Sequence, residues 1–96
     1  MHFVFYCKDK AGSEQVRTNN RLAHLDYLEA HKDKLLCAGP LLAEAGDGSR
    51  MVGSLLILDL PDQAAAEAFA AADPYGKAGL FESVTIHPWR KVLPRA

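Results

Sequence analysis

Cysteine and long apolar runs are scarce in this 96-residue chain. The two cysteines, Cys7 and Cys37, are too few for a disulfide scaffold or a cysteine-based zinc site, and we expect two buried free thiols. No apolar run approaches the ~20 residues that span a bilayer, and the first residues lack the pattern of a signal peptide. We therefore expect a cytoplasmic protein with no membrane partner.

An excess of charge of either sign is also missing. The chain has 11 Lys and Arg residues against 12 Asp and Glu residues, a net charge of -1, and most bases are interleaved with acids. Nucleic-acid-binding domains usually carry a basic stripe and a strong positive charge. We therefore expect no nucleic-acid partner.

Apolar residues, by contrast, make up 49% of the chain, which is typical of a globular protein. The length fits a single domain that spans residues 1–96. A chain this short buries only roughly 60–65% of its unfolded surface, so its stability alone is marginal. Association with a second copy through another apolar face is therefore expected.

The pattern of apolar residues and breakers predicts six elements in the order βαββαβ. Ser13 is expected to cap the first helix, whose core stripe is Leu22, Leu25 and Leu28. Asp62 is expected to cap the second helix, which ends at Asp73-Pro74. The six predicted elements are strand 2–8, helix 13–34, strand 35–42, strand 53–60, helix 62–73 and strand 80–92, with a loop over 43–52.

Right-handed crossovers arrange this order as a ferredoxin-like α+β fold, a four-stranded antiparallel sheet with strand order 4-1-3-2. Pro40 agrees with that arrangement, because proline cannot donate a ladder hydrogen bond and the second strand lies at an edge. Both helices cover one face of the sheet. The other face bears apolar residues, and we expect a homodimer to cover it.

Ionisable residues lie beside the leucines of the first helix. Arg17, Arg21, His24, Leu28 and His31 are spaced so that they form one row along the helix. The arginine stems could pack on the core while their heads reach water. Alternatively, the row lines a small-molecule pocket between helix and sheet.

Asp73 stands where the second helix ends, and there it meets the negative end of the helix dipole. Aspartate before proline is also an ordinary way to end a helix. A cation nearby would offset the penalty, and the first helix offers Arg21 and His24. An Asp73–His24 pair would orient the imidazole and raise its basicity, which is the arrangement of a general base.

Other chemistry is less well supported by the sequence. His2 and His87 lack a third ligand for zinc, and the glycines at 46 and 48 precede a strand rather than a helix. We expect no metal, no nucleotide and no other cofactor.

Five short motifs in order resemble the YciI-like family (YCII-related domain) over residues 2–93. They are R-x-x-H-L at 21–25, Ala38-Gly39-Pro40, Gly53-Ser54, Asp73-Pro74-Tyr75 and Pro88-Trp89. The resemblance implies a dimeric α+β barrel whose active site contains the matched His24 and Asp73. It also implies that Ser54, Gly39, Pro40 and Tyr75 lie near the same cleft.

Relatives in the family are linked to the breakdown of chlorinated, hydroxylated aromatics, and the wider superfamily includes lactone isomerases. The first hypothesis is therefore a metal-free lyase or isomerase. His24 would be the general base, Asp73 would orient it and Arg21 would stabilise an enolate or phenolate oxygen, while Ser54 and Tyr75 bind the substrate. The alternatives are a non-catalytic module that binds an anion or aromatic, and a purely structural His–Asp clamp between the helices.

Overall fold

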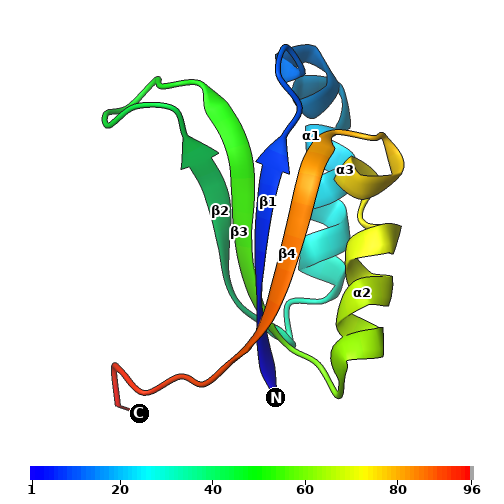
Figure 1. Cartoon of the computed structure of the whole chain (residues 1–96), viewed down its shortest axis with the longest axis vertical. Coiled ribbons are helices and arrows are strands. Elements are labelled where there is room, and N and C mark those ends of the chain that lie inside the picture. The colour runs from blue at the N-terminus through cyan, green and yellow to red at the C-terminus, as the bar shows by residue number, and fades with distance from the viewer. Residues whose placement is uncertain (96) are drawn as a thin grey trace.

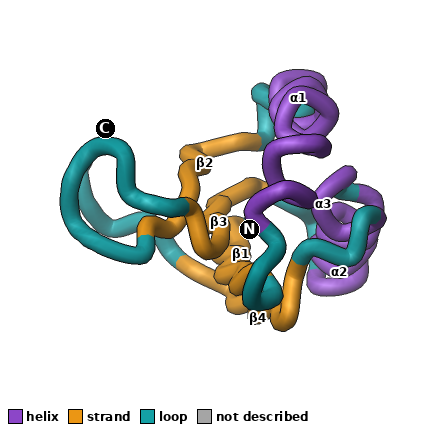
Figure 2. Tube along the Cα trace, turned by 90° about the horizontal axis from the view of Figure 1, so that it is seen from above, coloured by secondary structure: helices purple, strands orange, loops and turns teal. Residues whose placement is uncertain are grey.

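The computed structural model describes residues 1–95 and consists of an antiparallel sheet with helices packed on one face (Figures 1 and 2). The predicted element order is confirmed, with one extra short helix before the last strand. The elements are β1 (His2–Asp9), α1 (Glu14–Ala30), β2 (Leu35–Leu42), β3 (Met51–Asp59), α2 (Gln63–Ala72), α3 (Pro74–Lys77) and β4 (Phe81–Trp89).

The sheet has the strand order β2-β3-β1-β4, which confirms the predicted ferredoxin-like topology. All three neighbouring pairs are antiparallel. β2, which contains Pro40, is an edge strand as expected. In the register of the sheet, Phe5 of β1 pairs with Leu56 of β3 on one side and with Ile86 of β4 on the other.

The core lies between the sheet and the helices. Alternate residues of β1 and β3 point toward the helices, because successive side chains of a strand face opposite ways. Leu28 of α1 and Phe69 of α2 close the core from the helical side. The fully or almost fully buried apolar side chains of the sheet are Phe3, Phe5, Cys7, Leu56 and Leu58.

The predicted leucine stripe of the first helix is wrong for two of its three members. Leu22 is 74% exposed and Leu25 is 41% exposed, whereas the buried residues of α1 are Arg17, His24 and Leu28. Each residue turns an α-helix by about 100°, so Leu22 lies roughly 200° from His24. The row of ionisable residues, and not the leucine row, therefore faces the sheet.

The first helix is also shorter than predicted. It ends at Ala30, and the next four residues form turns in which Lys34 donates its N–H to the carbonyl of His31. These turns lead the chain directly into β2. Ser13 is the N-cap residue, but its side chain makes no capping hydrogen bond.

Three boundary predictions need smaller corrections. β3 begins at Met51, so the loop is 43–50, and β4 spans Phe81–Trp89 rather than 80–92. Val84 is exposed because β4 is an edge strand. Cys37 is exposed on the other edge strand, so only Cys7 is a buried free thiol. Burial raises the pKa of Cys7 to about 12, and the charge of Asp73 adds to this effect.

No helix within residues 1–95 covers the second face of the sheet, as Figure 2 shows. Tyr6 pairs with Leu55 and Val4 with Ile57 across β1 and β3, so the four side chains share this face. Tyr6 is exposed and the other three are half-buried. Within residues 1–95, none of the helices is long and apolar enough to cross a membrane.

Candidate functional site

A cavity of about 140 Å³ lies between α1, the middle of β2 and β3, and the start of α3. For comparison, a cavity of about 150 Å³ is large enough for benzene. The apolar lining residues include Leu25, Leu28, Ala38, Pro40 and Met51. The polar lining residues are Arg17, Arg21, His24, Ser54 and Tyr75. The cavity is therefore of the size of one aromatic ring, and its lining combines apolar side chains with charged and hydroxyl groups.

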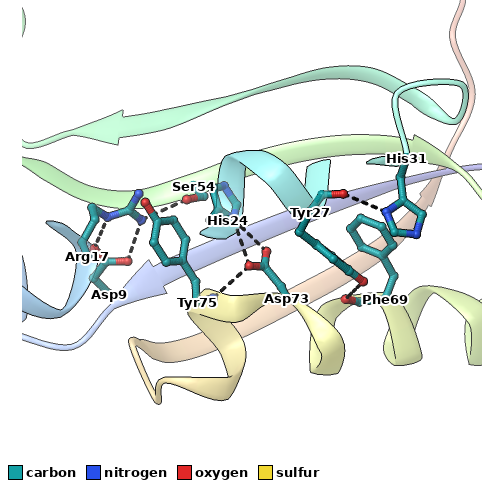
Figure 3. A network of polar contacts seen from close by, with 9 residues as sticks. All are labelled: Asp9, Arg17, His24, Tyr27, His31, Ser54, Phe69, Asp73 and Tyr75. Carbon is teal, nitrogen blue, oxygen red and sulfur yellow. Dashed lines mark hydrogen bonds and ion pairs between the residues drawn. The ribbon is translucent and has the colours of Figure 1, made fainter. Parts of the chain in front are cut away.

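His24 and Asp73 form a buried pair beside this cavity (Figure 3). The Nδ1 atom of His24 lies 2.9 Å from Oδ1 and 3.1 Å from Oδ2 of Asp73. The two residues are 6% and 2% exposed. An ionised carboxylate only accepts hydrogen bonds, so in the neutral ring the proton is on Nδ1. The lone pair is then on Nε2, which is the arrangement that a general base requires.

Asp73 lies just past the last residue of α2, not in its final turn as predicted. Its backbone is extended, with φ -60° and ψ 130°, because Pro74 follows. The same carboxylate caps α3, since Oδ1 accepts the N–H of Tyr75 at 2.9 Å. Asp73 is therefore held by two donors, which come from helices far apart in the sequence.

Tyr75 connects the pair to the rest of the site. Its ring stacks on the imidazole of His24, with 4.0 Å between the centroids and 15° between the planes. The guanidinium carbon of Arg17 lies 4.6 Å from the centroid of the Tyr75 ring. Burial raises the pKa of the Tyr75 hydroxyl, although the charge of Arg17 opposes the shift. Tyr75 thus restricts the imidazole from one side and stays neutral at physiological pH.

Arg17 is a buried part of the site that was not among the predicted site residues. Its Nε and Nη2 atoms donate to the carboxylate of Asp9 at 2.8 and 2.9 Å, and Nη2 also donates to Ser54 at 2.9 Å. Burial alone would lower the pKa of Arg17, but the hydrogen bond and charge of Asp9 outweigh it and raise the pKa. Snorkelling is therefore wrong for Arg17, whose head is buried. Its position seven residues before His24 was the available signal.

The structure brings six of the seven predicted site residues to the lining of one cavity, namely Arg21, His24, Gly39, Pro40, Ser54 and Tyr75. The seventh, Asp73, lies behind His24. Arg21 is exposed, and its side chain makes no hydrogen bond or ion pair with residues 1–95. The roles assigned to these residues remain predictions.

The other histidines lie outside this arrangement. His31 contacts the carbonyl of Tyr27 through Nδ1 at 2.8 Å, and His2 packs edge-on against Trp89. Among residues 1–95, His, Cys, Asp and Glu nowhere gather in groups of three that could hold a metal ion.

Fold and site together define a small ferredoxin-like α+β domain in which a buried His–Asp pair adjoins a cavity of ring size. More specifically, the chain belongs to the YCII-related domain family, whose model matches residues 1–90. Protein YciI of Escherichia coli is 40% identical, and the alignment covers 97% of this chain and 100% of the relative. An uncharacterized protein of Haemophilus influenzae is 34% identical with the same coverage.

A solved structure extends the comparison to a named activity. The chain is similar to 5-chloro-2-hydroxyhydroquinone dehydrochlorinase from Burkholderia phenoliruptrix AC1100, which was solved in complex with 2,5-dihydroxybenzoquinone. The identity is 42%, the TM-score is 0.87, and 94% of each chain is covered.

Proposed function

We propose that the protein is a small-molecule enzyme with lyase or isomerase chemistry, acting on a hydroxylated or chlorinated aromatic or on a lactone. The buried His24–Asp73 pair at the wall of a ring-sized cavity is the observation that carries this proposal. The similarity to a dehydrochlorinase supports the substrate class. His24 is the general base, and Asp73 orients it.

The chemistry begins with a proton transfer. Nε2 of His24 accepts a proton from a hydroxyl or an activated carbon of the substrate, and the electron pair stays on the substrate as a phenolate or enolate. In an isomerase the imidazolium returns the proton to another atom. In a lyase the electron pair expels a leaving group such as chloride, which departs with its bonding electrons. Neither route requires an oxidant. The isomerase route only moves a proton, and the lyase route loses H⁺ to His24 and Cl⁻ to solvent, which together amount to hydrogen chloride and remove no electrons from the substrate beyond those that leave with chloride.

The experiment that tests this proposal is turnover of 5-chloro-2-hydroxyhydroquinone by the wild-type protein under anaerobic conditions, since hydroquinones oxidise in air. We expect free chloride and a quinone absorbance to appear together, at a rate well above that in buffer. A panel of hydroxylated aromatics and lactones extends the test to isomerase chemistry. No turnover of any member would contradict the proposed function.

The non-catalytic alternative makes a different prediction for Asp73→Asn. A module that only binds anions should bind them equally well or better after a negative charge is removed. An enzyme that depends on the pair should lose rate. Tight binding of an anion in Asp73→Asn, together with no turnover in the wild type, would favour the binding module.

We also propose that the open face of the sheet forms a homodimer. Val4, Tyr6, Leu55 and Ile57 share this face and are covered by no helix. Ile57→Glu should raise the dimer dissociation constant by at least about 100-fold, because it buries an unpaired carboxylate. Leu22→Glu, the same kind of change at an exposed leucine of α1, is the control. Analytical ultracentrifugation measures the dimer dissociation constants of both variants and of the wild type. A wild type that stays monomeric at high protein concentration would contradict the proposed dimer.

A further inference from the structure

Asp9, Arg17 and Ser54 form a buried chain of hydrogen bonds that links the end of β1 to the middle of β3 through α1 (Figure 3). Asp9 holds Arg17 at two points, and Arg17 in turn contacts the oxygen of Ser54. The side chains of Arg17 and Asp9 are 7% and 6% exposed, and Ser54 is buried as well. This chain of contacts therefore has little access to bulk water.

The chemistry of the three groups fixes the direction of each hydrogen bond. A guanidinium only donates, so the oxygen of Ser54 must accept from Arg17. A serine hydroxyl has one hydrogen of its own to donate. Within residues 1–95 the hydroxyl of Ser54 donates to no acceptor, yet Ser54 lines the cavity. That hydrogen is therefore available to a ligand.

We propose that Ser54 binds the substrate oxygen that becomes negative after proton transfer, and that Arg17 is the positioning residue that makes Ser54 a donor. This inference deepens the proposed function and rests on it. Ser54 would recognise a phenolate, enolate or quinone oxygen, because its remaining hydroxyl hydrogen can form a hydrogen bond only with an acceptor. Accepting from a cation polarises the O–H bond of Ser54 and strengthens its own donation.

The sequence predicts this role for Arg21, but Arg21 and Ser54 differ in their surroundings. Arg21 lines the cavity but is exposed, so water and salt screen its charge. Ser54 is buried, and a hydrogen bond to a charged oxygen is worth more where water is excluded. The negative oxygen is therefore assigned to Ser54.

The experiment uses 2,5-dihydroxybenzoquinone as a coloured, acidic probe. Its dissociation constant and its pKa when bound are read from absorbance titrations against pH. Ser54→Ala should weaken binding of the anion by about 10- to 100-fold and raise the pKa of the bound probe. Ser54→Thr keeps a hydroxyl and should restore most of the effect. Arg17→Lys keeps the charge without the two-point ion pair and should give an intermediate pKa.

Two controls separate this effect from general disturbance. Ser83→Ala removes an exposed serine from β4 and should change nothing. Arg21→Gln should weaken binding of the probe anion less than Ser54→Ala does. If Ser54→Ala does not fold, as judged by circular dichroism, Ser54→Cys replaces it, because a thiol is a much weaker donor.

Equal affinity and equal probe pKa in the wild type and Ser54→Ala would overturn the assignment. A larger loss in Arg21→Gln, or no binding of the anion by the wild type, would overturn it as well. The proposed function can fail independently of this assignment. In that case the wild type binds the probe and Ser54→Ala weakens the binding, but the wild type turns over no substrate.

Discussion

Replacing His24 by alanine should reduce turnover of the chlorinated hydroquinone by about 10²- to 10⁴-fold, the usual contribution of a general base. The cavity should still bind 2,5-dihydroxybenzoquinone, because its apolar wall and Ser54 remain. The measurement is kcat from chloride release, compared with probe affinity in the same variant. Turnover that survives the change would contradict the role of His24.

Asp73→Asn tests how the pair works, since it keeps the shape of the side chain. An asparagine amide can donate to Nδ1, which places the ring proton on Nε2 and blocks its lone pair. We expect most of the loss seen in His24→Ala, with little change in probe affinity. If only the melting temperature falls while kcat stays constant, the pair is a structural clamp between the helices.

Arg17→Met should reduce the free energy of unfolding by about 3–5 kcal/mol, because it leaves the carboxylate of Asp9 buried without a partner. Arg21→Met is the matched control. Arg21 is exposed and unpaired within residues 1–95, so its replacement should change the free energy by less than about 0.5 kcal/mol. Urea denaturation at constant protein concentration measures both changes.

A double variant shows whether the lost partner is the cause. Arg17→Met combined with Asp9→Leu removes both charges and should recover much of the stability lost in the single variant. Catalysis should not recover, because Ser54 still lacks its donor. A double variant as unstable as the single one would mean that packing of Arg17 against Tyr75 matters more than the ion pair.

The topology could be predicted from the sequence because it depends on short-range signals. Alternation in β1, the Asp62 cap, the Asp73-Pro74 break and Pro40 each fix one element or its place in the sheet. Connection rules then leave one arrangement. The topology also predicts that the site residues lie close together, because most of them belong to β2, β3 and α1, which are neighbours in this fold.

The orientation of α1 could not be predicted, because two neighbouring rows of residues compete for the same face. Leucines at 22 and 25 favour one orientation by hydrophobicity alone. The other orientation is favoured by two ion pairs, of Arg17 with Asp9, eight residues away, and of His24 with Asp73, 49 residues away. A contact over 49 residues leaves no local signal in the sequence. Arg17 and Arg21 lie in the same row of the helix, and only the contacts of Arg17 with Asp9 and Ser54 distinguish them.

The protonation of the His24 ring tests the central claim most directly. Long-range proton–nitrogen NMR of the folded wild type distinguishes a ring nitrogen that carries hydrogen from one that does not. With the neutral imidazole, we expect hydrogen on Nδ1 and a free lone pair on Nε2, and the reverse in Asp73→Asn. Hydrogen on Nε2 in the wild type would contradict the account, because His24 could not then accept a proton from a substrate in the cavity.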